Sequence, residues 1–227
     1  IATLLGLQLT ISNKTSVVAH SAPLAAHVSN TLRRLGAPAK TEKSWLDCGV
    51  MFAGGGKANK TNQDQRIAQA HLRAHRISTA CKFDKRAVIL ATTGVQPMQA
   101  YGSSAVGTTY LTAARMRSNL VSAVYGRKAQ PCPTSLIHAQ LRPKNDPVIR
   151  IATKAINDWA FLWRNAKPST RALLRTAWTQ CLHEHQGHTN NLPLVGPITG
   201  TIAWITFVGW KPALPNTWTD HSDPNDL

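Results

Sequence analysis

The sequence predicts a mainly α-helical protein, in which a small strand–helix–strand piece precedes a helical body. Two observations favour this fold class. Extended or alternating apolar patterns fall within the first 53 residues, whereas later apolar residues recur at the three- and four-residue spacing of helices. The chain has 227 residues, of which 43% are hydrophobic. It is therefore long enough to bury a sizeable core and too apolar for global disorder.

The N-terminal piece, residues 1–53, is predicted to have α/β character. Residues 1–12 alternate loosely between apolar and polar positions, and residues 15–19 resume an extended apolar segment after a turn. A helix is expected between the cap residue Ser21 and Gly36. Its predicted buried stripe is Leu24, Val28, Leu32 and Leu35. A short strand is expected from Trp45 to Phe52, before the glycine run at residues 54–56 that marks a domain boundary.

The next region, residues 57–130, is predicted to be a basic helical domain. A helix over residues 62–80 has the apolar stripe Ile67, Ala70, Leu72, Ala74 and Ile77. Residues 87–105 predict a helix with a turn near Gln96-Pro97. A helix over residues 108–125 is expected to turn Ala113, Met116, Leu120 and Val124 inward and Arg115 and Arg117 outward. Residues 127–133 are expected to form a loop.

The last region, residues 131–227, is predicted to be a Trp-rich helical domain with an irregular tail. Asp146 is expected to cap a helix whose first residue is Pro147. Further helices are expected to begin at Pro168 and at Pro197, and the tail from Pro212 is expected to be irregular. Core packing is the expected role of the tryptophans in this region, with base stacking as the alternative.

The charge of the chain indicates a polyanionic partner. Twenty-six Lys and Arg stand against ten Asp and Glu, which gives a net charge of +16 and a pI near 10.4. Seventeen of the basic and four of the acidic residues lie in residues 1–128, so the positive field is concentrated there. Nucleic acid is the expected partner, and an anionic membrane is the weaker alternative because no basic amphipathic helix carries a large exposed apolar face.

The expected phosphate contacts cluster in residues 57–86, which hold eight basic and two acidic residues. Clustered like charge costs stability unless a polyanion compensates it, although a solvated helix face is the alternative for any single residue. The predicted nucleic-acid-binding residues are Lys57, Lys60, Arg66, Arg73, Arg76, Lys82, Lys85 and Arg86, with Arg115, Arg117, Arg127 and Lys128 as a second group.

No motif in the chain predicts catalysis or a cofactor. There is no phosphate-binding loop motif and no pair of carboxylates on a strand for two-metal chemistry. One group could ligate zinc: Cys181, His183, His185 and His188. Histidines at the end of a helix are the alternative interpretation of this group. Asp220, Asp223 and Asp226 are expected to be solvated charges of the tail.

The cysteines and the first residue of the chain give indications of the cellular compartment. Cys48, Cys81, Cys132 and Cys181 are widely separated, which is typical of reduced, partly buried thiols in an intracellular protein. No stretch is long and apolar enough to span a bilayer. The chain begins with Ile, so we expect a fragment or a processed product from which an upstream targeting segment could have been removed. A mitochondrial location is expected, with the nucleus as the alternative.

Two segments in order resemble reverse transcriptases. Gly6-Leu7-Gln8-Leu9 followed by Ser12-Asn13-Lys14-Thr15 is similar to the segment that follows the YxDD strand of that family. The segment from Trp45 to Val50 resembles the family's primer-grip hairpin. The basic helices, the Asp146-Pro147 helix and residues 196–212 are similar to the thumb and C-terminal extension of non-LTR-type retroelements.

The resemblance implies roles for a few residues. Lys14 would correspond to the lysine that assists proton transfer to pyrophosphate, and Leu46, Gly49 and Val50 would support the primer terminus. The helix over residues 62–80 would lie on the template–primer backbone. Two departures stand out: Cys48 replaces the usual Leu, and the YxDD aspartates are absent. We therefore expect no polymerase activity from this chain alone.

Two functions follow from these expectations. The first is a non-catalytic RNA-binding module derived from a reverse transcriptase, working with other proteins in a ribonucleoprotein such as an organellar ribosome. The second is a template–primer-binding fragment of an active RNA-directed DNA polymerase whose catalytic aspartates lie upstream.

Overall fold

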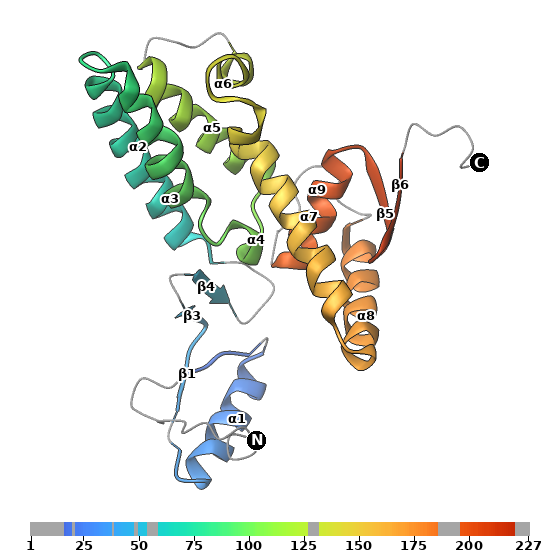
Figure 1. Ribbon diagram of the computed structural model, residues 1–227. Helices are drawn as coiled ribbons and strands as arrows, with labels where there is room; N and C mark the ends of the chain where they lie inside the picture. The colour runs from blue at the N-terminus through green and yellow to red at the C-terminus, as the bar shows by residue number, and fades with distance from the viewer. Residues whose placement is uncertain are drawn as a thin grey trace. The chain divides into compact units, whose positions relative to one another are not determined.

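Figure 1 shows the computed structural model of the chain, which describes residues 16–19, 21–37, 39–47, 50–53, 59–126, 132–185 and 196–220. The described residues are mainly helical, and a small strand-containing piece precedes the helices, as predicted. The packing divides the chain into two compact units, residues 1–59 and residues 60–227. This division falls near the glycine run at residues 54–56.

The described residues of the first unit form one helix and two small sheets. Its elements are β1 (Ser16–Val17), α1 (Ala22–Arg34), β2 (Lys40–Thr41), β3 (Ser44–Asp47) and β4 (Val50–Ala53). β1 and β2 pair in parallel, and β3 and β4 form an antiparallel pair in which Trp45 lies opposite Phe52. The single strand predicted from Trp45 to Phe52 is therefore wrong: two strands pair with each other, so each satisfies backbone groups of the other.

The buried face of α1 also differs from the prediction. Leu24 and Leu35 are exposed, whereas Ala25 and Ser29 are buried. The small residues allow a close approach of the chain that follows the helix, where Ala37 and Ala39 are also buried. The Ser29 hydroxyl donates a hydrogen bond of 2.6 Å to the Ala39 carbonyl, which fixes this contact.

The described part of the second unit is a helical body followed by a β-hairpin. Its longer helices are α2 (Thr61–Ala80), α5 (Tyr110–Tyr125), α6 (Pro133–Leu141), α7 (Pro147–Asn165), α8 (Pro168–His185) and α9 (Pro197–Phe207). Short helical segments are η2 (Lys85–Val88), η3 (Ala91–Val95), α3 (Gln96–Ala100), α4 (Ser103–Val106) and η4 (Pro143–Asn145). β5 (Trp210–Leu214) and β6 (Thr217–Asp220) pair antiparallel.

In the first half of this unit, α2 packs along α5, and η3 and α3 lie beside both (Figure 1). Ala70 and Ala74 of α2 are fully buried against a cluster that includes Val95 and Leu120. Alanine at these positions lets the two helix axes approach closely. Leu72, which was predicted to be inside, is 63% exposed because it falls on the opposite side of α2.

In the second half, α5, α7, α8 and α9 enclose the remaining core. Trp159, Trp178 and Trp204 are buried, which confirms the predicted core role for these three tryptophans. The rings of Trp159 and Trp178 lie 4.9 Å apart, and both indole N–H groups donate to carbonyls, of Pro215 and Pro212 respectively. The strand β5 and the turn after it are thereby fixed to the helical body.

Two further predictions for this unit are wrong, and one helix was missed. The chain does not turn at Gln96-Pro97: Val95 and Gln96 both keep right-handed helical dihedral angles, so η3 continues into α3, and the chain turns instead at Gly102, whose φ is 74°. The helix α6 was not predicted at all. The tail after Pro212 is a hairpin as far as Asp220, since its backbone groups pair across β5 and β6.

Candidate nucleic-acid interface

Five hydrogen-bonding side chains form a continuous row along α2. They recur at intervals of four and three residues, so they lie on one side of the helix. We call this row the α2 polar stripe; it consists of Asn62, Arg66, Gln69, Arg73 and Arg76. From its first to its last residue the stripe extends about 21 Å at the helical rise of ~1.5 Å per residue. The arginines of the stripe were predicted from the sequence, whereas Asn62 and Gln69 were not, although their spacing would have revealed them.

The neighbours of the stripe are Tyr101, which directly follows α3, and Gly94 of η3. The guanidinium of Arg66 lies 4.6 Å from the centre of the Tyr101 ring, and its Nη1 donates to the Tyr101 carbonyl at 3.4 Å. A Cβ placed on Gly94 would lie 3.9 Å from Cδ of Arg73, so the stem of this arginine passes beside η3. Cations therefore line the seam where α2 meets these two segments.

The stripe carries no acidic residue. Asp64, the one acidic residue of α2, lies on the opposite side of the helix. Among the described residues, no ion pair involves Arg73 or Arg76, and both are exposed. The positive charge of these two side chains is therefore available to an external anion.

Further cations follow the end of α2. Lys82, Lys85 and Arg86 are exposed. Asp84 caps η2 by accepting a hydrogen bond from the Arg86 amide at 2.9 Å, and it pairs with the Arg86 guanidinium at 3.0 Å. The hydrogen bonds from Arg86 hold the pKa of Asp84 below its usual range. Asp84 is therefore paired with Arg86, whereas Lys82 and Lys85 form no ion pair with it.

The remaining predicted binding residues are distributed unevenly. Lys60 is half-buried just before α2, and Arg115 is exposed on α5. Lys57, Arg127 and Lys128 lie outside the described residues.

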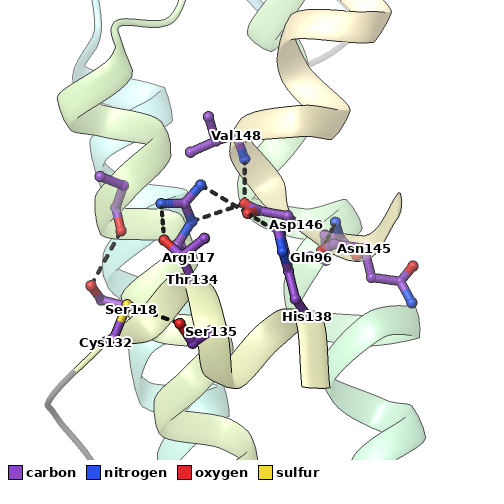
Figure 2. Close-up of polar contacts among 11 residues, drawn as sticks. Gln96, Arg117, Ser118, Cys132, Thr134, Ser135, His138, Asn145, Asp146 and Val148 are labelled. Atoms are coloured by element: carbon purple, nitrogen blue, oxygen red, sulfur yellow. Dashed lines mark hydrogen bonds and ion pairs between the residues drawn. The ribbon is translucent and has the colours of Figure 1, made fainter. Parts of the chain in front are cut away.

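Arg117 was predicted to point outward, and this prediction is wrong. Its side chain is only 11% exposed and forms a two-pronged ion pair with Asp146, through Nε at 2.9 Å and Nη2 at 2.8 Å (Figure 2). Its Nη1 donates to the Thr134 hydroxyl at 2.7 Å. The Arg117 side chain turns inward because the carboxylate of Asp146, buried at the start of α7, needs a positive counter-charge. Arg117 is therefore not a candidate for phosphate contact.

Asp146 contacts residues of three helices, α5, α6 and α7. It is fully buried, caps α7 by accepting from the Val148 amide at 2.9 Å, and also lies 3.3 Å from Nε2 of His138 on α6. Figure 2 shows that these groups converge on its two oxygens. Because each oxygen is occupied by donors from the fold, we infer that the cluster stabilises the packing of α5, α6 and α7.

Two arginines of α8 also contact α7, at its C-terminal end. Arg171 donates to the carbonyls of Trp163 and Arg164, at 3.0 and 2.7 Å, and so satisfies backbone acceptors at the end of α7. The guanidinium of Arg175 lies 6.0 Å from the Trp163 ring.

The weak zinc candidate is only partly within the described residues. Cys181 is half-buried and packs against the Trp159–Trp178 cluster, and His183 is exposed. The side chain of His185 and the whole of His188 lie outside the described residues. Within the part of the chain that is described, no three His, Cys, Asp or Glu side chains gather as metal ligands would.

The residues implied by the reverse-transcriptase resemblance lie in the first unit. Leu46 is exposed on β3 and Val50 is half-buried at the start of β4. Lys14, Cys48 and Gly49 lie outside the described residues, as do Asp223 and Asp226 of the tail. Asp220, expected in an irregular segment, is the last residue of β6.

The cysteines occupy different environments. Burial raises the pKa of the Cys81 thiol, with a further contribution from the charge of Asp84. Cys132 is exposed, and a hydrogen bond from the Ser135 hydroxyl, 3.3 Å from its sulfur, lowers its pKa. The expectation of partly buried thiols therefore holds for Cys81 and Cys181 but not for Cys132.

The chain matches no known family: comparisons with protein-family models, with curated proteins and with solved structures find nothing similar. None of the described helices combines the length and apolarity needed to cross a membrane.

Proposed function

We propose that this chain is a non-catalytic RNA-binding module that contacts the phosphate backbone through α2 and the residues that follow it. The observation that carries the proposal is the α2 polar stripe, which presents three arginines on one side of a helix with no carboxylate among them. Arg73 and Arg76 are both exposed, and like charges at this spacing repel one another, so an external polyanion would stabilise them.

The contacts would position RNA without reading its sequence. Arginine, asparagine and glutamine side chains all donate to phosphate oxygens, which every sequence shares. Lys82 and Lys85 would continue the positive surface beyond the end of α2. We therefore expect salt-sensitive binding with little sequence preference.

A salt titration tests this proposal. Binding of a labelled RNA by the whole chain, followed by fluorescence anisotropy, is expected to weaken linearly in a log–log plot, with a slope of roughly −0.7 to −0.9 for each phosphate contacted. Several contacts predict a slope of about −3 or steeper. An affinity that stays flat between about 50 and 200 mM salt would rule the proposal out.

The origin and setting of the module are part of the proposal. The order of an extended segment, a helix, a β-hairpin and basic helices supports derivation from a reverse transcriptase. A ribonucleoprotein such as an organellar ribosome is the setting that we propose, with other proteins as neighbours. Recovery of ribosomal RNA with the native chain is the expected result, and its absence from such particles would remove this part of the proposal.

A second candidate function is a template–primer-binding fragment of an active RNA-directed DNA polymerase. The β3–β4 hairpin favours it, because Leu46 and Val50 lie on its two strands as a primer grip would require. A transcript that continues upstream into a YxDD-bearing palm would favour this candidate, and a targeting peptide in that place would exclude it.

A further inference from the structure

Phe83 is an apolar side chain displayed to solvent at the end of α2. It is 89% exposed. The turn that carries it is well defined, since the Phe83 amide donates to the Ala80 carbonyl at 3.0 Å and the Asp84 amide donates to the same carbonyl. The Asp84–Arg86 pair fixes the chain directly after it. The ring is therefore held outward by a hydrogen-bonded turn and contributes little to the core.

The surroundings of Phe83 combine apolar and positive groups. Ile89 and Leu90 are 63% and 48% exposed a few residues later. Lys82 precedes the ring, and Lys85 and Arg86 follow it. We call residues 82–90 the basic apolar tip. The α2 polar stripe runs toward this tip, because Arg76 is followed after four residues by the end of the helix.

We propose that the basic apolar tip binds single-stranded RNA, with an unpaired base stacked on the Phe83 ring and the adjacent phosphates held by Lys82 and Lys85. The inference rests on the proposed function and names its ligand class. Every base offers a face to an aromatic ring, whereas a paired base inside a duplex does not, so the ring selects unpaired nucleotides without selecting a sequence.

The distribution of charge favours a nucleic-acid strand over a membrane at this tip. An apolar tip among lysines would also suit an anionic bilayer. However, the positive stripe extends about 21 Å along α2 away from the tip, so a planar surface that met the tip end-on would leave that charge without a partner. A flexible strand can follow the stripe and reach the ring at its end.

Substitution of Phe83 in the whole chain tests the inference. Affinities would be measured by fluorescence anisotropy for a 12-nucleotide single-stranded RNA and for the same strand in a duplex. Phe83→Ala is expected to weaken single-strand binding by roughly tenfold to a hundredfold, the range for loss of one stacked base. Its salt slope and its duplex affinity should not change, because no phosphate contact is removed. Phe83→Tyr should restore single-strand binding.

Phe161→Ala is the matched control, since Phe161 of α7 is likewise exposed, at 71%. It should leave both affinities unchanged, and circular dichroism melting curves would show that all variants are folded. An unchanged single-strand affinity in Phe83→Ala, or an equal loss for the duplex, overturns the inference while the proposed function stands. Phe83-dependent binding to anionic vesicles without a preference for single strands also overturns it. The absence of salt-dependent binding by the unmodified chain defeats the proposed function itself.

Discussion

Two arginines of α2, Arg73 and Arg76, occupy a different electrostatic setting from Arg117 of α5 and Arg171 of α8. Arg73 and Arg76 of α2 are exposed, and no ion pair among the described residues includes them. Arg117 of α5 is held by Asp146, and Arg171 of α8 is held by backbone carbonyls at the end of α7. A count of basic residues therefore overstates the binding surface, because some guanidinium groups already bind partners within the protein.

The largest expected effect concerns the buried pair that ties down Arg117. Asp146→Asn keeps a side chain that can cap α7 but removes the counter-charge of an arginine that is only 11% exposed. Breaking a buried ion pair from one side typically lowers the free energy of unfolding by about 3–5 kcal/mol. Urea denaturation followed by circular dichroism would measure the loss.

The control for this substitution is Asp158→Asn. Asp158 pairs with Lys154 at 2.9 Å on the exposed surface of α7, where such pairs contribute about 0.3–0.5 kcal/mol. If the two substitutions destabilise the protein equally, Arg117 and Asp146 do not form the structural cluster described above.

A smaller effect should distinguish the thiols of the two regions. Cys132, beside the Arg117 cluster, has a lowered pKa, whereas burial raises the pKa of Cys81 after α2. At a pH below both pKa values, a larger fraction of Cys132 is thiolate, so iodoacetamide should modify it faster. The rate at Cys132 should also level off at a lower pH than the rate at Cys81.

Peptide mapping by mass spectrometry would follow the two sites separately. Ser135→Ala, which removes the hydrogen bond to the Cys132 sulfur, should slow modification of Cys132 and leave Cys81 unchanged. Faster modification of Cys81 than of Cys132 would contradict the described environments.

Local sequence signals predicted the longer helices other than α6. Asp146 and Pro147 placed the start of α7 correctly, because a cap and a proline act within one turn. The spacing of the apolar residues correctly placed Ala70, Ala74 and Ile77 on the buried face of α2. Of the three α2 arginines predicted to contact phosphate, Arg73 and Arg76 are exposed, whereas Arg66 is half-buried beside Tyr101.

Contacts between distant segments could not be predicted in this way. Arg117 and Asp146 are 29 residues apart, so neither residue's neighbours in the sequence indicate the pair. The β5–β6 hairpin is likewise held by distant residues, since the indoles of Trp159 and Trp178 donate to the carbonyls of Pro215 and Pro212. Phe83 was not identified because an apolar residue beside a helix end is usually buried, and only its exposure reveals it.

The most direct test compares charge reversal in the two regions. One variant changes Arg66, Arg73 and Arg76 to Glu, and the other changes three exposed cations of α7 and the linker after it, Arg150, Arg164 and Lys167, to Glu. Both variants alter the net charge equally, so a difference reports location. We expect the α2 variant to lose most of its RNA affinity and to flatten the salt slope by about 2–3, with little change in the other variant. Equal losses in the two variants would show that RNA does not bind along α2.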